Sequence, residues 1–273
     1  MLINGTATLR CKDFLRQEIA HTLECYGHLP IPRIFEVTSM ENLAYRLYAI
    51  EVAIADTLSQ WCDQETCMHT LRLVNLAEAV GRQLQLSDHA LIILRLSALL
   101  HDIGKVAIPA EILQKRGPLN DAERTLIRLH PQMGWVILEG TGELFDHVAP
   151  IIVAHHEAWD GSGYPFGLIG TAIPYLARIL AVVDSYDAMV SYRVYGEPLP
   201  ILSACLELID CAGRQYDPQI VVAFLKVLIG ERGIQLHSCF ASRRNLAING
   251  LEPVDEGCAK PLLQSVEYAR ELA

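Results

Sequence analysis

Residues 88–105 read DHALIILRLSALLHDIGK, and this stretch carries the strongest indication of the fold class. Its apolar residues recur with helical spacing over 90–100, which predicts a buried helix. His101 and Asp102 follow directly, so two polar side chains end an apolar segment. An unpaired buried carboxylate costs several kcal/mol, which a coordinated cation would offset. The alternative is a helix end that reaches solvent, with Gly104 as its C-terminal cap.

The same helical spacing recurs along most of the chain, and strand-like alternation is scarce. Ser87 and Asn120 are residue types typical of helix N-caps. The sequence therefore predicts an all-α fold. The predicted helices cover residues 41–60, 65–86, 88–101, 121–139, 143–156, 174–191, 198–212 and 217–230.

The composition argues against nucleic-acid and membrane partners. The chain has 273 residues, 51% of them hydrophobic, which is enough to bury a sizeable core. Its formal net charge of -10 argues against a nucleic-acid binder, although a bound cation would allow a small phosphate-bearing substrate. No signal peptide is evident, and the apolar runs are shorter than the ~20 residues that span a bilayer. The eight cysteines include no CxxC pair. We therefore expect a cytoplasmic protein with reduced thiols and no membrane partner.

Side chains that bind metals recur at helical spacing or at the ends of apolar segments. Glu65 and His69 lie four residues apart, on one face of a predicted helix, but exposed pairs of this kind are common. His130 precedes a proline at a bend, where a lone histidine is more often structural. His155 and His156 end the apolar segment PIIVAHH over 150–156.

Asp184 interrupts the apolar run RILAVVD over 178–184 in the same manner. The alternative for Asp184 is a helix carboxylate paired with Arg178 or Arg193. Mixed histidine and carboxylate ligands suit Mn, Fe, Co or Zn, and the absence of cysteine disfavours a structural zinc. The candidates exceed what one metal needs, so two or three ions with a bridging carboxylate, most simply Asp102, are predicted. The eight candidates are Glu65, His69, His101, Asp102, His130, His155, His156 and Asp184.

Two longer motifs give the sequence a family resemblance. LLHDIGKVAIPAEILQKRGPLNDAE over 99–123 and HHEAWDGSGYPFGLIGTAIPYLARILAVVDSYDAM over 155–189, with His130 between them, resemble the HD-GYP family of bacterial signalling phosphodiesterases. The match covers roughly residues 60–230. It implies an all-α, HD-superfamily helical bundle with a bi- or trinuclear metal centre.

The resemblance also implies a reaction. Cyclic di-GMP is the usual substrate of the family, and linear pGpG is the expected product, with hydrolysis on to GMP expected of a trinuclear centre. A hydroxide that bridges two metals, with a lowered pKa, would attack the phosphorus.

The resemblance assigns roles to individual residues. His101 and Asp102 correspond to the HD pair, with Asp102 as the bridge, and Glu65 corresponds to a ligand of a third metal. Lys105 corresponds to a lysine beside the metals, and Arg193 to a contact with a substrate phosphate. Iron or manganese is expected. The remaining implied ligands are His69, His130, His155, His156 and Asp184.

One departure from the family keeps other readings open. The family commonly has Arg-Pro-Tyr followed by a basic residue, whereas this chain has Arg193-Val194-Tyr195-Gly196. One phosphate contact is therefore missing, and another substrate, such as cyclic GMP-AMP or pGpG, is an alternative. A sensor that binds cyclic di-GMP without turnover and signals through protein partners is a third reading, against which the full ligand set argues.

The Gly-Tyr-Pro loop offers no obvious metal ligand. Its glycines and Pro165 suit a tight turn, and we expect Glu157 to orient a ligating histidine. In the family this loop is linked to diguanylate cyclase domains, which makes them a candidate partner. We expect a catalytic domain over 41–232, with extensions of unassigned role over 1–40 and 233–273.

Overall fold

The computed structural model describes residues 64–115, 117–139, 143–191 and 197–232. Regular structure in these ranges is helical, apart from two isolated β-bridges, Asp160 with Ile169 and Ala212 with Tyr216. The all-α prediction is therefore confirmed. The predicted helix over 41–60 and the residue Arg193 lie outside the described residues, and the predicted domain boundaries stay predictions. Within the described part, every helix is too short or too polar to cross a membrane.

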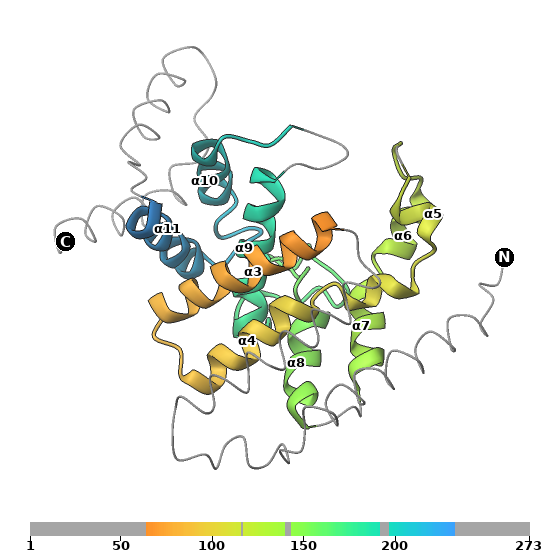
Figure 1. Cartoon of the computed structure of the whole chain (residues 1–273), viewed down its shortest axis with the longest axis horizontal. Helices are drawn as coiled ribbons and strands as arrows, with labels where there is room; N and C mark the ends of the chain where they lie inside the picture. Colours follow the sequence, from red (N-terminus) through yellow and green to blue (C-terminus); the bar gives the residue numbers. More distant parts are fainter. Residues whose placement is uncertain (1–63, 116, 140–142, 192–196, 233–273) are drawn as a thin grey trace. The chain divides into compact units, whose positions relative to one another are not determined.

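The described chain divides into two compact units. Figure 1 labels the helices of both. The first comprises 64–75 and 87–156, and the second comprises 76–86 and 157–232. Helix α3 (Gln64–Gln83) contributes to both. The first unit also contains α4 (Asp88–Leu100), η2 (Ile103–Ala107), α5 (Ala110–Leu113), α6 (Asp121–Ile127), α7 (His130–Leu138) and α8 (Glu143–Val153). The second contains η3 (Gly170–Ala172), α9 (Tyr175–Val190), α10 (Ile201–Asp210) and α11 (Pro218–Arg232).

Helix α4 forms the centre of the first unit. Its side chains are buried from Leu91 to Leu100 with the exception of Arg95, as expected for a helix that is apolar almost all round. It packs against α8, and α7 packs against both α8 and η2. This packing brings the end of α4, the start of α7 and the end of α8 to one place.

The predicted N-caps are confirmed. The Ser87 hydroxyl accepts the Ala90 N–H at 3.3 Å at the start of α4. Asn120 and Glu123 form a reciprocal capping box at the start of α6, with bonds of 2.9 and 2.8 Å. These two caps fix where α4 and α6 begin.

The prediction of one continuous helix over 121–139 is wrong. Helix α6 ends at Ile127, and α7 begins at His130. Pro131 explains the break, because proline lacks an N–H and its ring excludes the carbonyl four residues earlier, whereas it fits the first turn of a new helix. His130 therefore occupies the first position of α7.

The predicted helix over 143–156 is too long, because α8 ends at Val153. His155 and His156 lie in the turn that follows it. In the second unit, the predicted helices over 174–191, 198–212 and 217–230 correspond to α9, α10 and α11. The core of that unit includes Tyr186 of α9 against Phe224 of α11, with ring centroids 4.8 Å apart.

Candidate metal centre

Six predicted metal ligands lie together in the first unit. They come from four segments: α3, the end of α4, the start of α7 and the turn after α8. Successive imidazole rings have centroid separations between 3.9 and 5.5 Å. The six residues are His69, His101, Asp102, His130, His155 and His156.

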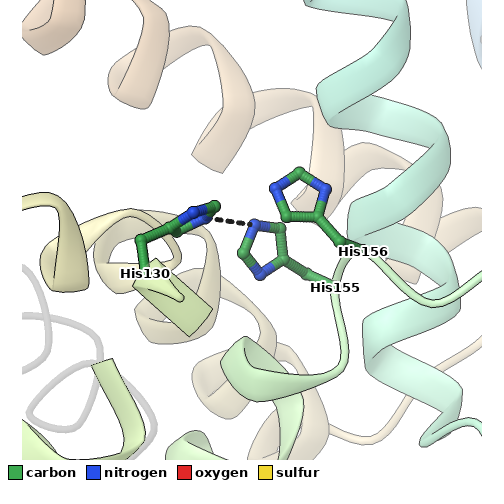
Figure 2. Close-up of side chains that lie close together, drawn as sticks. All are labelled: His130, His155 and His156. Carbon is green, nitrogen blue, oxygen red and sulfur yellow. Dashed lines mark hydrogen bonds between the residues drawn. The ribbon is translucent and has the colours of Figure 1, made fainter. Parts of the chain in front are cut away.

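The six side chains form two groups of three. One group contains His130, His155 and His156, and Figure 2 shows these three rings turned toward one another. The His130 Nε2 and His155 Nε2 atoms lie 3.4 Å apart. The second group contains His69, His101 and Asp102. Within each group, one potential ligand atom per residue lies within 4.8 Å of the others.

The carboxylate of Asp102 joins the two groups. Its Oδ2 lies 3.2 Å from the His101 Nε2, and its Oδ1 lies 3.3 Å from the His130 Nε2. The Lys105 ammonium donates to Oδ2 at 2.5 Å. One oxygen of the carboxylate therefore faces each group, which is the arrangement that a bridging ligand requires.

Backbone carbonyls fix the orientation of three histidines. In each, Nδ1 lies within hydrogen-bond distance of the carbonyl oxygen three residues earlier: 2.8 Å for His101, 2.7 Å for His130 and 2.5 Å for His155. A carbonyl only accepts, so Nδ1 carries the proton and Nε2 keeps its lone pair. Hydrogen bonds of this kind set the tautomer and aim of metal-binding imidazoles.

Burial and local charge favour the protonation states that metal binding needs. Burial lowers the pKa of His155 well below its ordinary value, and the neighbouring histidines lower it further. Burial also lowers the pKa of His130. Burial opposes ionisation of Asp102, yet Lys105 and the adjacent imidazoles hold the pKa of its carboxyl well below the usual range. Neutral imidazoles around an ionised carboxylate form the donor set of a divalent metal site.

These donors fit the implied metal ions. The two groups offer nitrogen and carboxylate oxygen atoms with no cysteine, as first-row divalent metals accept. His101, His130 and His155 are buried, which limits competition from water. The alternative that residues 101 and 102 end the helix in solvent is wrong, because His101 is buried and Gly104 is packed inside η2.

Other predicted site residues lie elsewhere or are incompletely described. Lys105 lies beside Asp102, and its expected place beside the metals stays a prediction. Asp184 is half-buried on α9 in the second unit, so its role as a ligand stays a prediction. Glu65 lies in the first turn of α3, where only the backbone is described, and Arg193 is outside the described residues.

The prediction that Glu157 orients a ligating histidine is wrong. Its carboxylate is buried and accepts the backbone N–H groups of Phe166 at 2.7 Å and Leu168 at 2.9 Å. A Cβ added at Gly163 would collide with the backbone of Glu157 and Ala158, so only glycine fits there. Glu157 therefore holds the Gly-Tyr-Pro loop, and Gly163 lets the loop close against it.

We expect Glu157→Gln to loosen this loop. One acceptor oxygen becomes an NH₂ group that faces a backbone N–H, which costs about 1–3 kcal/mol for a buried group. Hydrogen exchange at the Phe166 and Leu168 amides should accelerate about tenfold or more, as a loss of this size implies. Glu123→Gln is the matched control, because the Glu123 carboxylate also accepts a backbone N–H, from Asn120, on α6 of the first unit. Unchanged exchange at both loop amides would contradict the assigned role.

Comparison with known proteins gives a match to one family and to several individual relatives. A family model for the HD domain matches residues 50–220. A cyclic di-GMP phosphodiesterase of Thermotoga maritima is 40% identical over 185 residues, which cover 67% of this chain and 50% of that protein. A 3'3'-cGAMP-specific phosphodiesterase 2 of Vibrio cholerae is 36% identical over 164 residues, which cover 60% of this chain and 31% of that protein.

A solved structure shares the fold. The HDG"Y"P protein Bd1817 of Bdellovibrio bacteriovorus superimposes with a TM-score of 0.51 at 21% identity, over 80% of this chain and 71% of that chain. The chain spans about half, or less, of the length of the curated relatives it matches.

Proposed function

Because this chain belongs to the HD domain family, as its resemblance to the HD-GYP branch predicted, we propose that it is a metal-dependent phosphodiesterase that hydrolyses a cyclic dinucleotide. The observation that carries the proposal is the pair of three-ligand groups joined by Asp102. Cyclic di-GMP is the substrate we propose first, since it is the substrate named for the relative from Thermotoga maritima. The proposed product is pGpG, with further hydrolysis to GMP if three metals are bound.

The two groups would hold two divalent metal ions, which we propose to be iron or manganese. Bound metals lower the pKa of water to near neutrality and stabilise charge on the phosphoryl oxygens. Glu65 is proposed to assist a third ion, and Asp184 to complete the ligand set.

The protein's own side chains support this chemistry in distinct ways. The Nδ1–H bonds hold the imidazoles of His101, His130 and His155 with Nε2 toward the centre. Lys105 is partly exposed and places its ammonium beside Asp102, where it would attract an anionic phosphate. Arg193 is proposed to contact a second phosphate oxygen through its forked guanidinium.

Three further proposals concern substrate, partner and location. The relative from Vibrio cholerae is named for 3'3'-cGAMP, so a cyclic GMP-AMP dinucleotide is the second candidate substrate. The Gly-Tyr-Pro loop exposes two apolar side chains, Phe166 at 58% and Ile169 at 66%, and is the proposed contact for a diguanylate cyclase domain. We propose that the protein acts in the cytoplasm.

The full chain, reconstituted with Fe²⁺ or Mn²⁺, tests the proposed activity. We expect it to convert cyclic di-GMP to pGpG, and the rates with 3'3'-cGAMP and pGpG as substrates will rank the alternatives. Metal analysis of the same sample gives the number of ions bound per chain. Tight binding of cyclic di-GMP by the metal-loaded protein without any linear product would contradict the proposed hydrolysis. It would support the alternative of a sensor that binds cyclic di-GMP without turnover.

A further inference from the structure

Two glycines meet where the ligand-bearing segments of the first unit approach one another. Gly104 lies in η2, two residues after Asp102, and Gly134 lies in α7, which begins at His130. A Cβ added at Gly104 would collide with the His130 carbonyl oxygen and would lie 2.6 Å from the Gly134 backbone nitrogen. Gly104 does not adopt a positive φ, so its backbone conformation does not require glycine. Glycine is required at position 104 because the backbones of η2 and α7 approach each other closely there.

The second glycine extends the contact to α8. A Cβ added at Gly134 would lie 3.0 Å from the Ile152 Cδ1 and 3.4 Å from the Ile103 Cγ2. The carbonyl of Ile152 accepts the Nδ1–H of His155. The glycine pair therefore lies where η2, α7 and α8 come together, and each of these segments adjoins or contains a predicted ligand.

We propose that the contact between Gly104 and Gly134 is a spacer that sets the separation of the two metal positions, so that the carboxylate of Asp102 reaches both. This inference rests on the proposed metal centre. Two metals that share one carboxylate lie about 3.5–4 Å apart, which leaves little tolerance. Ordinary contacts between carbon atoms need about 3.5–4.0 Å, so a methyl group at position 104 would push η2 from α7 on the order of 1 Å. Such a shift would separate Asp102 from His130.

Four variants of the full chain test the spacer. Gly104→Ala introduces the collision with backbone. Gly134→Ala is a milder change that should fold well, because alanine is favoured over glycine inside a helix. Adding Ile152→Val to Gly134→Ala removes the Cδ1 atom that the new methyl would meet. Gly117→Ala is the matched control, since a Cβ there would meet nothing within 4 Å.

The readouts are Mn²⁺ content by elemental analysis and electron paramagnetic resonance of the Mn²⁺-loaded protein. Wild type and Gly117→Ala should show the spectrum of an exchange-coupled pair. Gly104→Ala should lose that spectrum, and its affinity for the second ion should fall by about 10–100-fold. Gly134→Ala should lower severalfold the fraction of protein that holds an exchange-coupled Mn²⁺ pair. The added Ile152→Val should restore that fraction.

The outcomes distinguish a failure of the proposed binuclear centre from a failure of the proposed spacer. Absence of a coupled pair in the wild type would refute the proposed binuclear centre itself. A coupled pair in the wild type that persists unchanged in a folded Gly104→Ala protein, as judged by circular dichroism, would refute the spacer. If Gly104→Ala does not fold, an undiminished coupled signal in Gly134→Ala refutes it equally.

Discussion

Asp102→Asn is expected to abolish binding of a second metal ion and to lower kcat by about 10³-fold or more, equivalent to ~4 kcal/mol of transition-state stabilisation. The carboxylate lies between the two ligand groups, with Oδ2 toward His101 and Oδ1 toward His130. Asparagine has nearly the same shape but keeps only one oxygen and carries no charge. One group therefore loses its link to the other, while the packing around position 102 is preserved.

Metal content and turnover are measured together on the same Mn²⁺-loaded protein. Asp146→Asn is the matched control, because Asp146 is an exposed carboxylate on α8 of the same unit. It should leave both quantities unchanged. An Asp102→Asn protein that retains two coupled metal ions would show that Asp102 is no bridge.

Asp217→Ala is expected to destabilise the second unit by about 3–5 kcal/mol. The Asp217 carboxylate pairs with Arg178 at 2.8 Å, and the two side chains are 3% and 11% exposed. The guanidinium also lies over the rings of Trp159 and Tyr175, with centroid distances of 5.7 and 4.8 Å. Removing the carboxylate leaves a buried cation without its charge partner. It also removes the bond from the Gln219 N–H at the start of α11.

Urea denaturation followed by circular dichroism and tryptophan fluorescence measures the loss. Glu78→Ala is the control, because it removes an ion pair on α3 with Arg82, at 2.6 Å, whose side chain is 64% exposed. That substitution should cost less than about 0.5 kcal/mol. A loss below ~1 kcal/mol for Asp217→Ala would mean that solvent reaches Arg178 and compensates its charge.

Much of the fold could be predicted from local pattern. Helices α4 and α9 were predicted because apolar spacing over a dozen or more residues is a strong signal. The break between α6 and α7 was missed because apolar spacing continues through 121–139. Its local cause, Pro131, was nevertheless present in the sequence. The break lets α7 start at His130, so this predicted ligand lies beside His155, with the two Nε2 atoms 3.4 Å apart.

The Glu157 prediction failed for a different reason. Its position directly after two predicted ligands favoured a role toward them. The structure instead supplies two backbone N–H donors from residues 166 and 168, which lie nine and eleven positions later. A buried carboxylate takes the donors that the folded loop presents, and sequence proximity does not reveal them.

The sequence by itself determined the ligand types, the helical class and the family, because these depend on residue identity and on short-range periodicity. Local sequence also determines the orientation of three imidazoles, because each Nδ1–H bonds the carbonyl oxygen three residues earlier. Asp102 was predicted as the bridge, but only the tertiary structure shows which predicted ligands form each group and that the two Asp102 oxygens face different groups. That arrangement depends on how closely η2, α7 and α8 pack, which two glycines far apart in the chain permit and which no local pattern specifies.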